Sequence, residues 1–204
     1  MTRLSAIAAL LVLVVSTLTG CAQMSGAGGE WTTLIDGNTG LDNFNRTGDA
    51  NWRAQDGAIV ADQGKGGFLV TKNSYKDFRL KAEFWADHTT NSGIFIRAAD
   101  PARVGADNSY EVNVFDQRPD QAYGTGAIVG FASVSPMPRA GGKWNTFEIV
   151  ARGSQIQVFF NGAMTVDLRD GKFPQGPFAL QFANGANNVP GGAIKWRKLQ
   201  IRAL

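Results

Sequence analysis

The chain has 204 residues, of which 44% are hydrophobic and 18% charged, and a formal net charge of +3. This composition predicts one folded domain, or at most two small ones, and argues against intrinsic disorder. A single cysteine and a single histidine exclude a disulfide framework, a Cys-rich zinc site and a multi-His metal site. Lysine and arginine form no run, so no nucleic-acid partner is expected.

The N-terminal residues have the pattern of a secretory leader. Arg3 precedes an unbroken apolar run over residues 6–15. This run is shorter than the ~20 residues that a membrane-spanning helix needs, but it suits the core of a signal peptide. The following Leu18-Thr19-Gly20-Cys21 resembles the bacterial lipobox, in which small residues precede a lipidated cysteine.

We therefore expect a lipoprotein signal peptide over residues 1–20, lipidation of Cys21 and a flexible tether over residues 21–29. An ordinary secretory signal with an incidental cysteine is the alternative. The lipoprotein interpretation places the protein in the bacterial cell envelope, anchored to a membrane on the extracytoplasmic side, in the periplasm or at the cell surface. ATP-dependent and nicotinamide-dependent chemistry is not expected there.

Residues 30–204 are patterned as β-strands. Residues 78–86 alternate apolar and mostly polar side chains, as a half-buried strand requires, and residues 110–116 and 178–182 repeat that period. Asn161-Gly162 lies between two strand-like runs and predicts a hairpin, and Asp56-Gly57 and Asp170-Gly171 are further turn dipeptides. About ten or more short strands with glycine-rich turns predict a single all-β domain, a jelly-roll β-sandwich.

Several short motifs, in their order along the chain, resemble one known family, the 3-keto-disaccharide hydrolase domain. The resemblance spans residues 30–204, and its most specific part is Asn91-Ser92-Gly93, then Tyr110-Glu111, then Trp144-Asn145. It implies a fold of the concanavalin A-like lectin/glucanase type and a saccharide ligand.

Strand alternation predicts where a ligand would bind. Within their strands, Glu111, Asn113 and Phe115 share one face, and Gln181 lies opposite its apolar neighbours. On the strand over residues 78–86, the side chains that share a face are Lys81, Glu83 and Trp85, together with Arg79. If these strands belong to one sheet, the polar sets line its outer face. Amide and charged groups there would bind hydroxyls, while Trp85 and Phe115 offer flat surfaces to a sugar ring. The alternative is that this is simply the solvated side of an antiparallel sheet.

The resemblance implies a site formed by Asn91, Arg97, Glu111 and Asp116. Two positions depart from the family pattern: Asn113 stands where glutamine is commoner, and Ala183 stands where many relatives carry a histidine. The second departure weakens the expectation of a hydrolase more than that of a glycan-binding protein.

The chemistry that the resemblance implies is removal of the acidic C2 proton of a 3-keto-glycoside, loss of the C1 substituent and addition of water. We expect Glu111 as the base, Arg97 at the developing oxyanion, Asp116 as a reserve acid or orienting group, and Asn91, Asn113 and Gln181 as hydroxyl binders. Glu111 and Asp116 differ by five positions, which places them on opposite faces of a regular strand, so they do not form a glycosidase carboxylate pair.

Three functions remain open at this point: a hydrolase or lyase on 3-keto-glycosides, a non-catalytic glycan-binding lipoprotein, and a structural envelope protein. His88 lies in a polar loop near the candidate site, as a solvent-exposed residue or a ligand contact. No cofactor is expected, a divalent metal is not supported, and no protein partner can be inferred.

Overall fold

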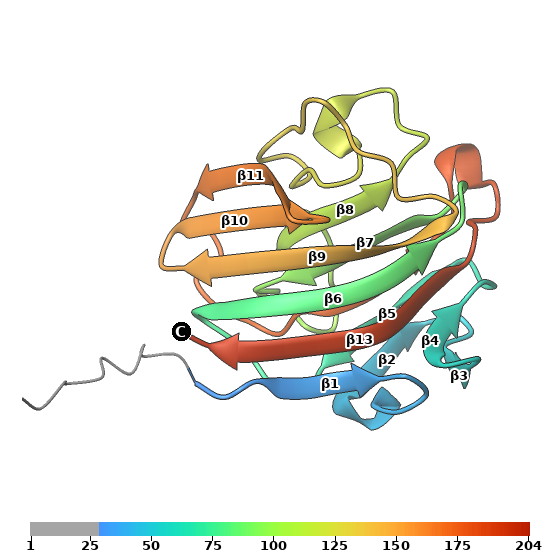
Figure 1. Ribbon diagram of the computed structural model, residues 1–204, viewed down its shortest axis with the longest axis horizontal. Coiled ribbons are helices and arrows are strands. Elements are labelled where there is room, and N and C mark those ends of the chain that lie inside the picture. Colours follow the sequence, from blue (N-terminus) through green and yellow to red (C-terminus); the bar gives the residue numbers. More distant parts are fainter. Residues whose placement is uncertain (1–28) are drawn as a thin grey trace, which may run out of the picture.

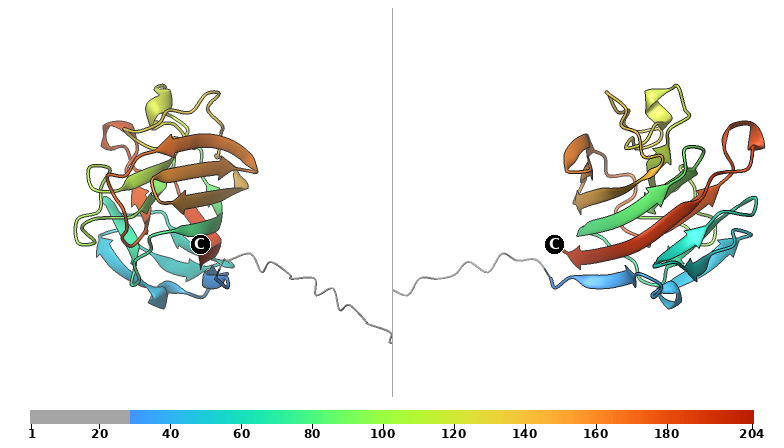
Figure 2. Two further views of the ribbon diagram at one scale, coloured as in Figure 1. Left: turned by 90° about the vertical axis from the view of Figure 1, so that its left-hand side faces the viewer. Right: turned by 45° about the vertical axis from the view of Figure 1, so that its right-hand side comes forward.

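The computed structural model describes residues 29–204, which form two antiparallel β-sheets (Figure 1). The signal peptide predicted over residues 1–20, Cys21 and all but the last residue of the predicted tether lie outside the described residues. The described chain starts beside the end of the last strand, where the Gly29 amide donates a hydrogen bond to the Ala203 carbonyl at 3.0 Å. Figure 2 shows the beginning of the described chain and its C-terminal end close together.

The larger sheet, sheet A, has eight strands in the order β11-β10-β9-β6-β13-β4-β3, with β1 also paired to β13. Its strands are β1 (Thr32–Asp36), β3 (Arg53–Gln55), β4 (Ala58–Ala61), β6 (Phe78–Ala86), β9 (Lys143–Arg152), β10 (Gln155–Phe160), β11 (Ala163–Arg169) and β13 (Ile194–Ala203).

The smaller sheet, sheet B, has five strands in the order β2-β5-β12-β7-β8. Its strands are β2 (Phe44–Gly48), β5 (Gly66–Thr71), β7 (Asn91–Ile96), β8 (Tyr110–Phe115) and β12 (Ala179–Ala183). Short 3-10 helices occupy three connections: η1 (Leu41–Asn43), η2 (Gln121–Tyr123) and η3 (Ala186–Asn188). The predicted all-β sandwich is thereby confirmed.

The core lies between the two sheets and follows from the alternation of side chains along the strands. In β6 the apolar positions are buried and the polar positions between them are partly or fully exposed. Aromatic rings fill much of the sheet A side. Phe84 stacks on Phe147, with 5.1 Å between ring centroids, and packs at a tilt against Trp196, at 5.3 Å. Because each sheet buries one row of side chains, each also presents one row on its outer face.

The turn predictions are confirmed at two of three positions. Asn161 and Gly162 (φ 49° and 81°) connect β10 to β11, and Asp56 and Gly57 (φ 50° and 76°) connect β3 to β4. The third prediction is wrong, because Asp170-Gly171 does not join two strands of a hairpin. The chain leaves β11 in sheet A there and continues to β12 in sheet B.

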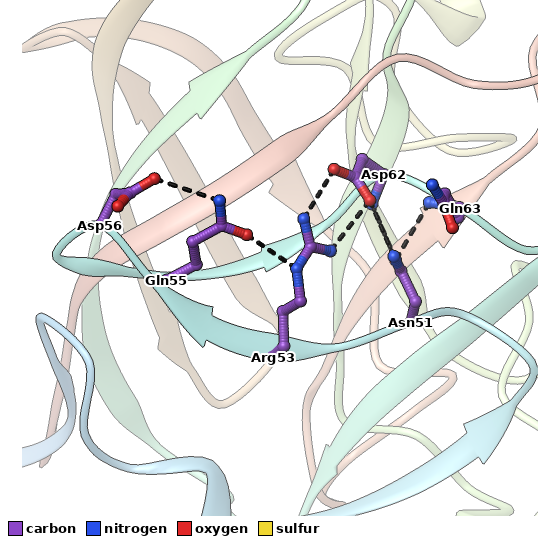
Figure 3. A network of polar contacts seen from close by, with 6 residues as sticks. All are labelled: Asn51, Arg53, Gln55, Asp56, Asp62 and Gln63. Atoms are coloured by element: carbon purple, nitrogen blue, oxygen red, sulfur yellow. Dashed lines mark hydrogen bonds and ion pairs between the residues drawn. The ribbon is translucent and has the colours of Figure 1, made fainter.

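A polar network holds the end of sheet A around β3 and β4 (Figure 3). Arg53 donates two hydrogen bonds to the Asp62 carboxylate, at 2.9 and 2.8 Å, and Asn51 donates a third at 2.8 Å. The Asn51 side-chain oxygen in turn accepts hydrogen bonds from the backbone N–H groups of Asp62 and Gln63. These bonds, above all the one from Arg53, lower the pKa of Asp62. Every group in this network therefore has a partner.

Candidate functional site

Three neighbouring strands of sheet B bring five of the predicted residues together on its outer face. Strand β7 pairs with β12 on one side and with β8 on the other, so that Gly93 lies between Gln181 and Asn113. Glu111 lies opposite Phe95, and Asn91 lies opposite Phe115. The residues that alternate with them along these strands face the hydrophobic core. The polar residues therefore project outward, as the alternation predicts.

These residues line a pocket of about 190 Å³. Its wall contains all five predicted residues and three that the sequence did not single out: Asn91, Glu111, Asn113, Phe115 and Gln181, then Arg118, Tyr123 and Val129. A second depression, of about 280 Å³, adjoins it through the shared Gln181 and extends past Ala183 toward β5 and β2.

Gly93 leaves the space that Glu111 occupies. A Cβ atom at residue 93 would lie 3.0 Å from the Val112 carbonyl oxygen and 3.5 Å from the Cγ atom of Glu111. A side chain there would crowd the backbone of β8 and would contact the Glu111 side chain. Gly93 lies within β7, and close packing against β8, not a turn, favours glycine at this position.

The carboxyl group of Glu111 is poorly solvated. No hydrogen bond joins it to any other group in the part of the chain that the structure describes. Burial raises its pKa to about 7, and the nearby positive charge of Arg118 partly opposes this shift. A carboxyl with this pKa changes between its acid and base forms near neutral pH, which suits a group that accepts and returns a proton.

Two amide side chains beside Glu111 are fixed through their nitrogen atoms. Asn91 donates to the Asn184 carbonyl and Asn113 to the Tyr123 carbonyl, each at 2.6 Å. The side-chain oxygens of Asn113 and Gln181 are buried and accept no hydrogen bond within residues 29–204. Buried acceptors of this kind are costly unless a ligand or a water molecule donates to them. The pocket therefore presents acceptors suited to ligand hydroxyl groups.

Arg118 provides the positive charge of the pocket. Its guanidinium carbon lies 4.8 Å from the centroid of the Tyr123 ring and 5.8 Å from that of Phe115. These contacts hold the arginine at the rim of the pocket by cation–π attraction. One weak signal for this residue is visible in the sequence, namely an arginine between Phe115 and Tyr123, but its loop has no strand period that would assign the side chain to a face.

The prediction that Arg97 stabilises an oxyanion beside Glu111 is wrong. Arg97 has φ 55°, which breaks the alternation of β7 and turns its side chain away from the outer face. Its buried guanidinium donates to the carbonyls of Lys76, at 2.9 and 2.6 Å, and of Gly153, at 2.8 Å, and pairs with Asp77 at 3.2 Å. Arg97 thus ties the loops at one end of the sandwich together and does not line the pocket.

Asp116 is also structural. Its carboxylate accepts hydrogen bonds from the Thr125 hydroxyl at 2.7 Å and from the backbone N–H groups of Ala140 and Gly141, the shortest of which is 2.8 Å. The predicted role as a reserve acid does not fit a carboxylate so fully engaged. These bonds instead position the chain between residues 117 and 139, from which Arg118, Tyr123 and Val129 reach the pocket.

The remaining predicted residues lie elsewhere. Lys81, Glu83 and Trp85 project from β6, which belongs to sheet A, so they are on the opposite outer face of the sandwich from Glu111. The prediction assumed one shared sheet, and alternation within a strand does not tell which sheet the strand joins. His88 is exposed beside Gly141 and Gly142 and does not line the pocket.

Within residues 29–204, no three His, Cys, Asp or Glu side chains gather as a metal site requires. In the same part of the chain, no helix has the length and apolar character needed to cross a membrane.

The profile of one protein family, the 3-keto-alpha-glucoside-1,2-lyase-like domain, matches residues 30–202. No curated protein sequence matches the chain.

Two solved structures illustrate the likeness in fold. A proposed glycosyl hydrolase from Parabacteroides distasonis superposes with a TM-score of 0.69 at 23% identity, over 86% of this chain and 100% of that one. The carbohydrate-binding module CBM66 from Bacillus subtilis superposes with a TM-score of 0.58 at 16% identity, over 87% of this chain and 98% of that one. At these identities the likeness establishes a shared fold.

Proposed function

The chain belongs to the 3-keto-alpha-glucoside-1,2-lyase-like domain family, and from this premise we propose that the Glu111 pocket binds a 3-keto-glycoside and releases its C1 substituent by elimination. The observation that carries the proposal is Glu111 itself. It is a partly buried carboxyl with a pKa of about 7, set over Gly93 and beside the positive charge of Arg118.

The reaction follows from the acidity that a 3-keto group gives to the C2 proton. The Glu111 carboxylate removes this proton, and the electron pair of the C–H bond moves into the C3 carbonyl to form an enolate. When the carbonyl re-forms, a C1–C2 double bond appears and the bond from C1 to the leaving oxygen breaks. The leaving oxygen takes up a proton, and water then adds its hydroxyl to C1 and a proton to C2. General-base help of this kind is worth on the order of 10²–10⁴-fold.

The other pocket residues have roles that match their geometry. The unpartnered oxygens of Asn113 and Gln181 accept hydrogen bonds from sugar hydroxyls. The rings of Phe115 and Tyr123 form an apolar wall against which a sugar ring packs. Arg118 stabilises the negative charge that develops on the enolate oxygen, which is the role that the sequence had suggested for Arg97.

The composition of the pocket wall supports elimination over ordinary glycoside hydrolysis. An ordinary glycosidase uses two carboxyl groups on either side of the scissile bond. Among the described residues, Glu111 is the one carboxyl that lines the pocket, and the neighbouring Asp116 is engaged by three hydrogen-bond donors. Proton abstraction from C2 requires only one base.

The test compares a 3-keto-glycoside with its parent glycoside, which has a hydroxyl at C3. We expect the wild-type protein to release the C1 substituent from the keto form and not from the parent, because only the ketone acidifies C2. Comparable release from both compounds would instead indicate an ordinary glycosidase.

A second candidate is non-catalytic glycan binding. The observation that favours it is that no imidazole lines either depression in the described structure, and that Ala183 stands beside Gln181 where many relatives are expected to carry a histidine. Binding of both the keto and the parent glycoside in a calorimetric titration, without release of the C1 substituent from either, would establish this alternative.

We also propose that the protein is a lipoprotein of the bacterial cell envelope, lipidated on Cys21. The support is the apolar run over residues 6–15 followed by Leu18-Thr19-Gly20-Cys21. Incorporation of labelled fatty acid into the wild-type chain, and its loss in Cys21→Ala, tests the anchor. Equal labelling of both chains would refute it.

A further inference from the structure

The outer face of sheet A, on the opposite side of the sandwich from the pocket, is rich in cations and tryptophans. It is formed by four adjacent strands, β1, β13, β6 and β9, which lie in front in Figure 1. The cations of this face are Arg79, Lys81, Arg152, Lys195, Arg197, Lys198 and Arg202, and its acids are Asp36, Glu83 and Glu148. Four of these cations lie on β13, and strand pairing brings them beside the cations of β6 and β9.

Three tryptophans share this face, and each lies against at least one cation. Trp31 lies 5.1 Å from the Lys81 ammonium and 5.0 Å from the Arg202 guanidinium, measured to the ring centroid. Trp85 lies 4.8 Å from the Lys195 ammonium. Trp144, which is 39% exposed, lies 4.3 Å from the Arg197 guanidinium.

The three acids are too few to neutralise the seven cations of the face. Glu83 pairs with Arg197 at 2.7 Å and Glu148 with Arg79 at 3.4 Å. Lys81, Lys195, Lys198 and Arg202 form no ion pair within the described residues. Positive charge is therefore in excess over the face as a whole, although the wall of its depression of about 370 Å³ balances Lys81 and Lys198 with Glu83 and Glu148.

This face adjoins the point at which the chain enters the fold. Gly29 is hydrogen-bonded to Ala203, next to Arg202, and Trp31 follows two residues later. From Cys21 to Gly29 the chain extends at most roughly 28 Å, at 3.3–3.6 Å per residue. A lipid on Cys21 would thus hold this edge of the domain within that distance of the bilayer.

We propose that the outer face of sheet A docks on the headgroups of anionic phospholipids. Lysine and arginine side chains are attracted to an anionic leaflet, and tryptophan is the residue that favours the boundary between headgroups and acyl chains. One lipid anchor combined with a basic surface is a common way to achieve stable membrane attachment. In this orientation the Glu111 pocket, on sheet B, faces away from the membrane and stays open to substrate.

The proposal does not depend on the catalytic one, and it can be tested without the anchor. The full chain carrying Cys21→Ser is mixed with vesicles of phosphatidylcholine alone or of phosphatidylcholine with 30% phosphatidylglycerol, and binding is measured by sedimentation. We expect stronger binding to the anionic vesicles, and weaker binding as salt is raised.

Two further chains in the same background remove four positive charges each. One carries Lys81→Gln, Lys195→Gln, Lys198→Gln and Arg202→Gln on the face; the matched control carries Arg46→Gln, Lys65→Gln, Lys72→Gln and Lys76→Gln, which lie away from it. The face variant should lose on the order of 100-fold in affinity for the anionic vesicles, while the control variant keeps most of its affinity.

The outcomes are distinguishable. Equal losses in the two variants would overturn the proposal, because net charge and not the face would then control binding. Equal binding to both kinds of vesicle, by every chain, would also overturn it. Binding to a soluble acidic polysaccharide without binding to anionic vesicles would show that the face serves a different polyanion. Quenching of tryptophan emission by brominated lipids, reduced in Trp144→Phe, would support the predicted orientation.

Discussion

Asp62 and Glu111 are both partly buried acids on β-structure, yet their surroundings are opposite. Asp62 accepts hydrogen bonds from Arg53 and Asn51, and these lower its pKa (Figure 3). The carboxyl group of Glu111 accepts no hydrogen bond in the described structure, and burial raises its pKa to about 7. The carboxylate at Asp62 is stabilised by the fold, while the carboxylate at Glu111 is destabilised by it.

This difference separates polar groups that hold the fold together from those that remain available to a ligand. Arg97 and Asp116, which the sequence placed in the site, belong with Asp62 because all their polar atoms are engaged by the protein. Asn113 and Gln181 belong with Glu111, because each keeps a buried oxygen without a partner. The polar atoms of the first group stabilise the folded chain. The unpartnered oxygens of the second group need a hydrogen-bond donor, which a ligand can supply.

The largest expected effect is on turnover in Glu111→Gln. Loss of the base should lower the rate of release of the C1 substituent from a 3-keto-glycoside by on the order of 10²–10⁴-fold. The matched control is Asp62→Asn, which removes an acid of the structural class and should leave turnover near the wild-type value. An equal loss in both variants would remove the distinction between the two acids.

The next largest effect concerns Arg97, which the account assigns to the fold. Arg97→Met should lower the free energy of unfolding by about 3–5 kcal/mol, because it leaves the carbonyls of Lys76 and Gly153 without their donors. Urea denaturation measures this loss. In the folded fraction the pH dependence of turnover should be unchanged. A shifted pH profile would indicate that Arg97 acts in the site.

Glu111 should also make stability depend on pH. Its pKa is about 7 in the folded protein and close to 4.5 when the chain is unfolded, so the folded state binds the proton more tightly. Its contribution to stability therefore falls as pH rises from about 4.5 to about 7. Glu111→Gln lacks this penalty and should be more stable than the wild type by about 3 kcal/mol at pH 8, but not at pH 4. Equal differences at both pH values would show that Glu111 is not buried as described.

The smallest effect is expected at Arg118. Its charge favours the ionised form of Glu111, so Arg118→Gln should raise the pKa of Glu111 and move the acid limb of the pH–rate profile to higher pH. The plateau rate should fall by about tenfold, since an exposed guanidinium is screened by water. Arg118→Lys should restore most of the pH profile. A shift toward lower pH would contradict the assigned role.

The sequence predicted the strands well, because alternation is a local property. Strand β6 matches its predicted range, and the outward set on β7, β8 and β12 converges as expected. Alternation could not predict that β6 joins the other sheet, which moved Lys81, Glu83 and Trp85 to the far face. Nor could alternation predict the orientation of Arg97, because a single positive φ at this residue reverses the direction of its side chain.

The loop residues of the pocket were beyond the reach of sequence patterns for a different reason. Arg118, Tyr123 and Val129 reach Glu111 because Asp116 fixes their loop through bonds to Thr125, Ala140 and Gly141. These contacts join residues as many as 25 positions apart. No periodicity connects such positions, so their meeting appears only in the folded chain.

The most direct test of the central claim, that Glu111 removes the C2 proton of a 3-keto-glycoside, is a reaction in deuterium oxide. Mass and NMR spectra of the sugar product, taken before the free 3-keto sugar exchanges on its own, report the hydrogen at C2. We predict one solvent deuterium at C2 with the wild-type protein and no accelerated reaction with Glu111→Gln. A product that keeps its original hydrogen at C2, together with an unchanged rate for substrate deuterated at C2, would contradict proton abstraction, because the C1 bond would then have broken without loss of the C2 hydrogen.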